Sequence, residues 1–290
     1  MFVADFANGL VVFNLPLTAT SAPAFTIAGG GTAGVAFDAA GNLYVSNVFA
    51  RTIAVYASPI SATSTPSKTI GPITGASLPG FLVFDSAGNL YVADFGNSQV
   101  EIFHPPFVGG PQAPAITMTG VPGTPVGMAF DLQGDLFVSG YTGVVVTAYR
   151  RPFVGGANTA VATMALPTGG GGIGRDTAND LIVGQADGTL ALIGPPFATG
   201  VTPFTVIGQT FLGGNPLDPA VEALNSATDA SGNIWVPFAG DGVLAPPPPA
   251  GGANQIGIAE FNPPFNGSNV SLIGLFQTGL GLPFSIAFGK

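Results

Sequence analysis

The sequence of 290 residues contains no cysteine and a single histidine, His104. The absence of cysteine excludes disulfide bonds, Cys-ligated zinc, iron–sulfur clusters and thiol nucleophiles. A single histidine also excludes a metal site built from several histidines. Charge is scarce as well, because only 7% of the residues are charged, against roughly a quarter in an ordinary soluble domain. The polar surface must therefore come mainly from uncharged side chains and from the backbone.

Basic side chains are the scarcest charged groups. Six Lys and Arg stand against fifteen Asp and Glu, which gives a formal net charge of −9. Nucleic acid and anionic membrane surfaces are bound by clusters of basic residues, and the only adjacent basic pair is Arg150-Arg151. Gly, Pro or polar residues interrupt every apolar run well short of the ~18 residues of a spanning helix. We therefore expect no nucleic-acid partner, no membrane insertion and no signal peptide.

Glycine and proline, in contrast, are abundant, with 44 and 27 copies. Both residues disfavour helices, and no segment shows a convincing helical period. The 23 Phe residues, with many Val, Ile and Leu, supply enough apolar surface to offset the chain entropy lost on folding. The composition therefore favours a folded all-β chain, which we treat as one domain spanning residues 1–290.

One segment recurs five times at intervals of about 47 residues. Each copy has an apolar run, an Asp, a tight turn with Gly or Asn at the position that favours positive φ, and a second apolar run. Each copy therefore predicts a strand, a turn and a second strand. Because the Asp recurs in every unit, we assign it to turn formation and not to catalysis. The five anchoring aspartates are Asp38, Asp85, Asp131, Asp176 and Asp229.

Each unit continues with a third alternating run, a proline corner such as FHPPF at 103–107, and a fourth short β run. Radial repetition of four-stranded units is the β-propeller architecture. The chain starts in register with a second strand, since residues 2–8 match 91–97, and residues 283–288 match a first strand at 125–130. We therefore predict a six-bladed propeller of four-stranded antiparallel blades, closed by one C-terminal strand and three N-terminal strands. The predicted blades are 283–290 with 1–28, 32–70, 79–118, 125–165, 170–207 and 223–274.

The segment 90–100, LYVADFGNSQV, resembles the NHL repeat, and corners such as FHPPF resemble those of bacterial NHL-type propellers. The resemblance implies the six-bladed fold and is nearly silent on activity. The other units drift from the repeat, because Gly140, Gln185 and Phe238 stand where it has Asp.

Two long connections are expected on one face of the propeller. In antiparallel blades, the connections from second to third strands and from fourth strands to the next blade share a face, and the longest of these are 208–222 and 239–254. Long loops on a rigid scaffold often bind ligands, so we predict a lip beside the axial pocket that carries Asp218, Glu222 and Asp241. The alternative is tolerated insertion, which costs little free energy.

Second strands end on this same long-loop face. Asp5, Asn47 and Asp94 fall there on consecutive blades, so their oxygens could converge on Ca²⁺, and Asp5 and Asp94 are weak calcium candidates. The alternative, which we favour, is that each side chain caps the following turn or bonds a neighbouring blade. Two carboxylates and one amide are few ligands for calcium. The six strand-end positions are Asp5, Asn47, Asp94, Gly140, Gln185 and Phe238.

The residues four positions before each anchoring aspartate should lie nearest the axis. None of them ionises near neutral pH, so this ring offers no acid–base pair. His104 is predicted near the rim of the opposite face, and Trp235 is predicted to pack between blades. Asn266 and Asn269 begin weak glycosylation sequons. The six axial residues are Gly34, Phe81, Gly127, Gly172, Asn225 and Ser285. Ser285 is counted from Gly289, which stands in the anchor position of the sixth unit.

Two functions stay open on this evidence. The first is a non-catalytic binding or structural module without a cofactor, outside the cell or in its envelope. It would contact a protein, peptide or glycan through the long-loop face and could self-assemble. Its candidate residues are Asp5, Asn47, Asp94, Gln185, Asp218, Glu222, Asn225 and Asp241. The alternative is a divalent-cation-dependent hydrolase or lyase, similar to gluconolactonases or streptogramin lyases, that uses Asp5, Asp94, Glu222 or Asp241.

Overall fold

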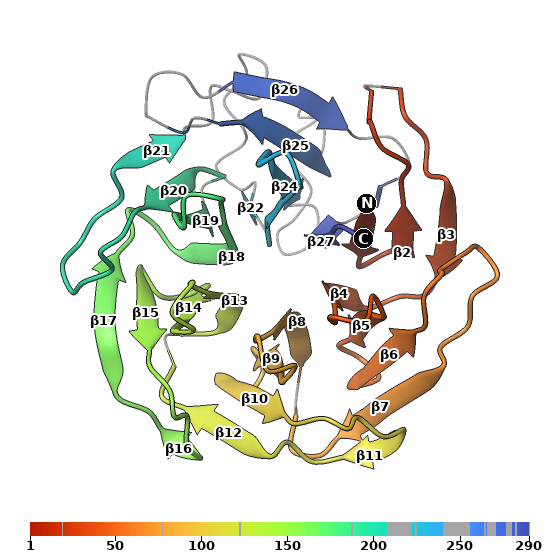
Figure 1. The fold of residues 1–290 in the computed structure, drawn as a ribbon, viewed down its shortest axis with the longest axis horizontal. Helices are drawn as coiled ribbons and strands as arrows, with labels where there is room; N and C mark the ends of the chain where they lie inside the picture. The colour runs from red at the N-terminus through yellow and green to blue at the C-terminus, as the bar shows by residue number, and fades with distance from the viewer. Residues whose placement is uncertain are drawn as a thin grey trace, which may run out of the picture.

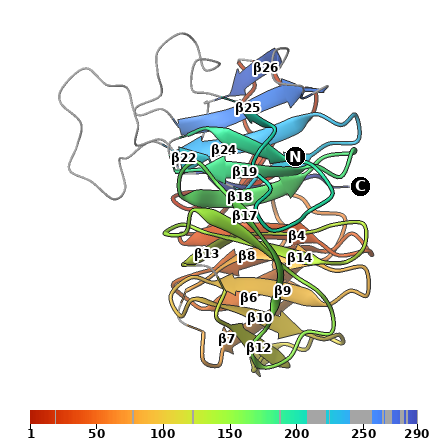
Figure 2. The same cartoon turned by 90° about the vertical axis from the view of Figure 1, so that its left-hand side faces the viewer.

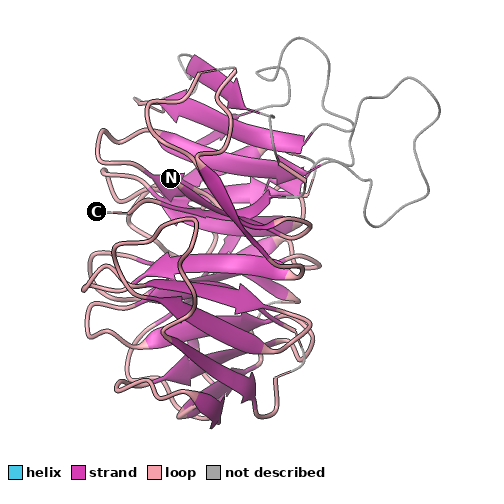
Figure 3. Cartoon of the chain, turned by 90° about the vertical axis from the view of Figure 1, so that its right-hand side faces the viewer, coloured by secondary structure: helices cyan, strands magenta, loops and turns pink. Residues whose placement is uncertain are grey.

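The computed structural model describes residues 1–18, 20–76, 78–121, 123–186, 188–207, 222–223, 225–239, 256–263, 265, 271–276, 280–281 and 283–289. Within these ranges the regular elements are strands, and they form six small sheets arranged in a ring. Figure 1 shows the ring along its axis, and Figures 2 and 3 show it edge-on. No helix suited to crossing a membrane occurs in the described ranges. The predicted six-bladed all-β propeller is confirmed.

The strands of each blade run outward from the axis in chain order, except that the innermost strand of blade 1 is the C-terminal strand. Blade 1 contains β27 (Pro283–Ala287), β1 (Phe2–Asp5), β2 (Gly9–Val12) and β3 (Phe25–Ala28). Blade 2 contains β4 (Thr32–Phe37), β5 (Leu43–Asn47), β6 (Thr52–Tyr56) and β7 (Lys68–Ile73). Blade 3 contains β8 (Pro79–Phe84), β9 (Leu90–Asp94), β10 (Gln99–Phe103) and β12 (Ile116–Thr119).

The second half of the ring follows the same order. Blade 4 contains β13 (Pro125–Phe130), β14 (Leu136–Gly140), β15 (Val145–Tyr149) and β17 (Ala160–Ala165). Blade 5 contains β18 (Gly170–Arg175), β19 (Leu181–Gln185), β20 (Leu190–Ile193) and β21 (Thr205–Ile207). Blade 6 contains the inner pieces β22 (Glu222–Ala223) and β23 (Ala227–Thr228), then β24 (Ile234–Ala239), β25 (Ile256–Asn262) and β26 (Ser271–Phe276).

The two ends of the chain close the ring, as predicted. β27 pairs antiparallel with β1, with Phe2 opposite Ala287 and Val3 opposite Ile286. Ile286 packs with Val3 and Trp235 in one buried apolar cluster. The C-terminal strand is therefore the innermost strand of a blade whose other strands are N-terminal.

The anchoring aspartates form the turns between first and second strands. Asp85 Oδ1 accepts hydrogen bonds from the backbone N–H groups of Ala87 and Asn89, both at 2.9 Å. Gly88 in the same turn has a φ of 81°, which favours glycine. The same Asp-to-backbone contact recurs in the other anchored units, which confirms the predicted turn role.

Two blades carry a fifth strand beyond the predicted four. β11 (Gly110–Gln112), from the proline-corner connection of blade 3, pairs in parallel with the outer strand β7 of blade 2. β16 (Gly156–Ala157), from the corresponding connection of blade 4, pairs in the same way with β12 of blade 3. These additions cover outer edges that would otherwise expose unpaired backbone groups.

Aromatic side chains at equivalent second-strand positions pack between blades. The Tyr91 ring contacts Phe130 and Phe153 of blade 4, with centroids 4.9 and 5.8 Å apart. Trp235 occupies the matching position in blade 6, and its ring lies 5.8 Å from that of Phe288. Its Nε1–H also donates to Asp229 Oδ2 at 2.9 Å. The predicted packing role of Trp235 is therefore confirmed.

The inner strands approach each other closely because small residues line their contacts. The first-to-second strand pairing is irregular near the start of the inner strand, for example between Pro79 and Leu82. There, Ser46 Oγ of blade 2 donates to Gly80 O of blade 3 at 2.6 Å. Ser139 Oγ of blade 4 makes the same contact with Gly171 O of blade 5. These contacts hold adjacent blades together around the axis.

Candidate functional site

Asp5, at the end of β1 on the long-loop face, binds backbone groups. Its buried carboxylate accepts hydrogen bonds from Asn8 N–H at 2.8 Å and Gly281 N–H at 2.7 Å. It therefore caps the following turn and also holds the segment that leads into β27. This agrees with the favoured alternative to calcium binding.

The other strand-end residues make similar local contacts. Asp94 accepts hydrogen bonds from Leu78 N–H and from the side chain of Asn97, both at 2.8 Å. Asn47 accepts one from Ala50 N–H and donates to Gly30 O, and Gln185 donates to Thr168 Oγ1. Within the described ranges, no group of three or more His, Asp or Glu is arranged to hold a metal ion. Asp5, Asn47 and Asp94 thus bond groups of nearby loops, which is the alternative favoured from the sequence, and these contacts give calcium binding no support.

The long-loop predictions fall mostly outside the described residues. Asp218 and Asp241 lie there, as do the sequons at Asn266 and Asn269. Glu222 belongs to β22, where its backbone pairs with Ala239. The binding lip on this face stays a prediction.

A buried carboxylate that was not predicted from the sequence lies beside Asp94. Glu101 is in the middle of β10 and is fully buried. Gln99 Nε2 donates to Glu101 Oε1 at 3.1 Å, whereas Oε2 has no partner. Burial, and then the charge of Asp94, raises the pKa of Glu101 to about 7. Equivalent positions in other blades hold Ala54 and Ala191. The sequence could therefore have indicated Glu101, because an acid stands there where other units have alanine.

Replacing this acid is expected to change the pH dependence of stability. In the unfolded chain Glu101 titrates near 4.5, and in the folded chain near 7. Between these values only the unfolded chain releases the proton, so folding stability falls as pH rises. Glu101→Gln should therefore unfold like the wild type at pH 4 and gain up to about 3 kcal/mol at pH 8. Urea unfolding of both proteins across this range measures the difference, and parallel pH profiles would contradict the assignment.

A large cavity lies on the axis and opens on the face opposite the long loops. Its volume is about 590 Å³, which is in the range of small-molecule sites. The turns that begin at Asp85 and Asp131 form part of its mouth. The inner edge of every blade contributes to its wall, at Val35, Leu82, Met128, Ile173, Ser226 and Ile286 among others.

Aromatic rings occupy the other end of the axis. Phe81 of blade 3 and Phe284 of blade 1 stack with centroids 6.3 Å apart. Because blade 2 separates these blades, the two rings meet inside the ring of sheets, next to the side-chain-free Gly34. Both rings lie near the start of inner strands, toward the long-loop face. The axial cavity is therefore accessible from the opposite face, which carries the turns between first and second strands and is called the turn face below.

The innermost strand of blade 6 is interrupted at the cavity. Between β22 and β23, Asn225 forms a parallel bridge with Ser285 of blade 1, and its N–H donates to Phe284 O at 3.1 Å. This detour places Asn225 and Ser226 in the cavity wall, where they are only 9% and 6% exposed. Asn225 Oδ1 and Ser226 Oγ have no hydrogen-bond partner.

Glycine makes room for this detour on the side of blade 5. A Cβ at Gly174 would lie 2.3 Å from Ser226 Oγ, so a side chain there would collide with blade 6. Thr228 Oγ1 donates to Arg175 O at 2.7 Å directly beside this contact. The position of Ser226 is thus fixed by its neighbours, although its hydroxyl is unpaired.

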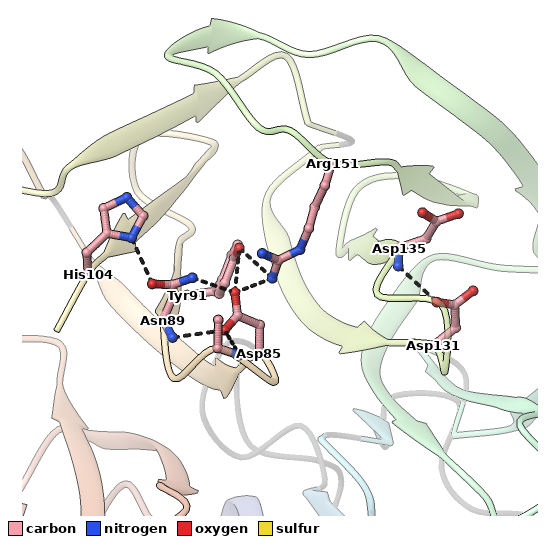
Figure 4. A network of polar contacts seen from close by, with 8 residues as sticks. Asp85, Asn89, Tyr91, His104, Asp131, Asp135 and Arg151 are labelled. Atoms are coloured by element: carbon pink, nitrogen blue, oxygen red, sulfur yellow. Dashed lines mark hydrogen bonds and ion pairs between the residues drawn. The ribbon is translucent and has the colours of Figure 1, made fainter.

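One side of the mouth is a polar network that joins blades 3 and 4 (Figure 4). Arg151 donates to Asp85, whose carboxylate also accepts from Tyr91 OH at 3.1 Å. The guanidinium lies near the rings of Phe130 and Phe153. Burial raises the pKa of Asp85, but hydrogen bonds from Asn89 and Arg151 outweigh it, so the pKa lies below its usual value.

His104 sits at the outer side of the same network. Its Nδ1 lies 2.8 Å from Asn89 Oδ1, and the residue is exposed. It does not line the axial cavity. The predicted place of His104, near the rim of the face opposite the long loops, is confirmed.

Arg175 is the cationic residue on the other side of the mouth. It ends β18 and lines the cavity. Its Nη1 donates to Asn179 Oδ1 at 3.0 Å, and Asn179 Oδ1 also accepts from Leu132 N–H of blade 4. Among the described residues Arg175 forms no ion pair. The sequence held a signal for it, because Arg175 stands where other units have Phe84 or Phe130.

Comparison with known families agrees with this architecture. Residues 77–103 match the family described as NHL repeat. The chain carries an NHL repeat. The match covers blade 3 from its inner strand through β10 and includes the segment 90–100 in which the sequence resembles this repeat. No curated protein matches the chain.

Solved propellers share the fold of this NHL-repeat chain at low identity. A protein of unknown function from Bacteroides caccae is 12% identical with a TM-score of 0.69, covering 98% of this chain and 96% of that one. The periplasmic gluconolactonase PpgL of Pseudomonas aeruginosa is 14% identical with a TM-score of 0.65, covering 97% and 83%. Virginiamycin B lyase from Staphylococcus aureus is 13% identical with a TM-score of 0.57, covering 88% and 73%. At these identities the likeness concerns the fold alone.

Proposed function

We propose that this protein is a non-catalytic binding propeller that receives a small ligand in the axial cavity on its turn face. One observation carries the proposal: a cavity of about 590 Å³ lies where all six blades meet, with apolar side chains of five blades in its wall and Arg151 and Arg175 at its mouth. Apolar ligand surface buried against this wall supplies binding free energy. The few polar groups at the mouth would orient the ligand. An extracellular or envelope location and self-assembly, which the composition suggests, stay predictions.

The ionisable groups at the cavity favour binding over acid–base catalysis. The charged residues in its lining are Asp85, Asp131, Arg151 and Arg175. Asp85 has a lowered pKa and an Arg151 partner, and Asp131 Oδ1 accepts two backbone N–H groups of its own turn. A general acid or base works best with a pKa near the working pH. Asp85 is poorly suited to either role, and Asp131 holds the backbone of its own turn.

The hydrolase or lyase alternative has weaker support. Of its acidic residues, Asp5 and Asp94 use their oxygens to bind loop N–H groups, and Asp241 lies outside the described residues. The alternative therefore rests on the fold shared with the gluconolactonase and the lyase. Turnover of a lactone by the purified protein, lost after Asp5→Asn or Asp94→Asn, would favour it over the binding proposal.

A cysteine-free chain allows the cavity to be blocked chemically. Ser86→Cys introduces a single thiol at an exposed position of the cavity lining, and a bulky maleimide would then obstruct the mouth. Fragments found by ligand-observed NMR should bind the unlabelled variant and lose binding after labelling. Ser231→Cys, at an exposed turn position on the same face, is the matched control and should bind equally well before and after labelling. Binding that survives the label on Ser86→Cys would overturn the proposal.

A further inference from the structure

An aromatic surface separate from the axial cavity lies on the long-loop face. It is formed by the connections from second to third strands, which carry Phe6 in blade 1, Phe49 in blade 2, Phe95 in blade 3 and Tyr141 in blade 4. Phe49 is 69% exposed and Tyr141 38% exposed, while Phe6 and Phe95 are partly exposed. Contiguous apolar surface that stays exposed marks an interaction site.

Aromatic rings form a continuous row from this surface to the axis. The Phe49 ring meets the Phe6 ring edge to face, with centroids 5.2 Å apart, and the Phe6 centroid in turn lies 5.2 Å from that of Phe284. Phe284 stacks with Phe81 at the axis. The inner rings therefore support Phe49, which stays exposed at the outer end of the row.

An open groove of about 500 Å³ lies beside Phe49, between blades 2 and 3. The buried residues Val48 and Ala76 line it. Phe49 and Arg51 line it from blade 2, and Asn97 lines it from blade 3. The groove therefore combines apolar surface with a guanidinium and an amide side chain.

The charge at this groove is positive. Arg51 is exposed and lines the groove, and it forms no ion pair with any residue that the structure describes. The acids that end β1 and β9 on this face, Asp5 and Asp94, are fully buried and accept hydrogen bonds from loop N–H groups. Although the whole chain has a net charge of −9, the electrostatic complement of this groove is a carboxylate.

These features fit a polypeptide better than a small molecule or a neutral glycan. A small-molecule site buries most of the surface of its ligand, whereas this groove is open and the aromatic surface extends over four blades. Aromatic residues and Arg are enriched at the centres of protein interfaces, and this surface combines them. A neutral glycan would stack on the rings but would leave the charge of Arg51 unmatched.

We infer that this groove binds a segment of a partner protein in which an aromatic or aliphatic side chain stands beside Asp or Glu. The apolar side chain of the partner packs against Phe49 and Val48, and the carboxylate pairs with Arg51. Because the groove lies on the face opposite the mouth of the axial cavity, this inference goes beyond the function proposed above and does not depend on the ligand of that cavity.

Random peptides displayed on phage test the chemistry of the partner. The library is selected on the immobilised full chain and, in parallel, on Phe49→Ser. Peptides enriched on the wild type should carry an aromatic or aliphatic residue beside Asp or Glu, and they should not be enriched on the variant. Enrichment of basic peptides, equal enrichment on both proteins, or no enrichment would overturn the inference.

The most enriched peptide, synthesised with a fluorescent label, then measures the two contacts by fluorescence polarisation. Phe49→Ser should weaken its binding about 30-fold, and Arg51→Gln about tenfold. Replacing the acid of the peptide by its amide should weaken binding to the wild type but not to Arg51→Gln. The matched controls are Phe204→Ser and Arg150→Gln, which change an exposed ring and an exposed guanidinium away from the groove, and both should bind like the wild type.

Two further measurements separate this groove from the axial cavity and from a glycan site, with the folding of each variant checked by thermal unfolding. A bulky maleimide on Ser86→Cys, on the turn face, should leave the affinity of the peptide unchanged. Loss of the peptide with that label would place its site at the axial cavity and overturn the inference. Binding of cellohexaose that Phe49→Ser abolishes, with the peptide unaffected by this variant, would assign the groove to glycans and overturn it as well.

Discussion

A protein lacking residues 283–290 is expected to lose its cooperative unfolding transition. β27 supplies the innermost strand of blade 1, and its removal leaves β1 with an unpaired edge along the axis. It also removes Ile286 and Phe288 from the cluster that contains Val3 and Trp235. Unpaired edges invite aggregation, and the opened ring loses contacts on both sides of the gap. We therefore expect this truncation to destabilise the protein more than any single substitution at a contact between blades.

The single tryptophan reports this loss directly. Trp235 lies 5.8 Å from Phe288, so its fluorescence should shift toward that of solvent-exposed indole in the truncated protein. A control restores the strand elsewhere: residues 283–288 are placed ahead of Met1 through a turn copied from 85–89. This permuted protein should unfold cooperatively, because the turn then joins β27 to β1. A truncated protein that melts like the full chain would contradict ring closure.

Gly127→Ala is expected to cost about 3 kcal/mol, because it inserts a methyl group between two blades. An ideal Cβ at Gly127 would lie 2.6 Å from both Gly171 O and Ile173 N, and 2.5 Å from Ser139 Oγ. The first two are backbone atoms of the inner strand of blade 5, so relief requires the blades to move apart. The same movement would disturb the contact between Ser139 and Gly171.

Gly29→Ala is the matched control for this prediction. No atom lies within 4 Å of a Cβ built at Gly29, and its φ is not in the left-handed region. Alanine there should be neutral, or slightly stabilising through the unfolded chain. Urea midpoints of the two variants and the wild type give the comparison. Equal midpoints for Gly127→Ala and Gly29→Ala would show that the blades do not meet at this glycine.

The fold was accessible from the sequence because its signals are local. Each anchoring aspartate, such as Asp85, bonds residues two and four positions later, so one short pattern marks every turn. Ring closure was accessible because residues 283–288 and 2–8 complete the missing unit of the repeat. The extra strands β11 and β16 were not, since their pairing depends on where a connection falls across a neighbouring blade.

The candidate site was harder to predict because it depends on contacts between blades. The axial ring was assigned to residues four before each anchor, but the cavity wall is lined mainly by residues three before, such as Leu82 and Met128. Irregular pairing at the start of the inner strands shifts which residues face the axis. The rings of Phe81 and Phe284, which occupy the long-loop end of the axis, come from different blades. No single repeat therefore shows at which end the axial cavity is open.

The central claim, that the axial cavity binds the ligand, is tested most directly by the methionine methyl resonances. The chain has four methionines, and Met128 lines the cavity. Met118 and Met164 are buried but do not line it. Met1 lies in the apolar cluster that contains Val3 and Trp235. In protein labelled with ¹³C-methyl methionine, a fragment found by ligand-observed NMR should shift the Met128 resonance and leave the other three in place. A saturating probe that leaves Met128 unmoved, or shifts Met1 or Met164 instead, would place binding elsewhere and contradict the account.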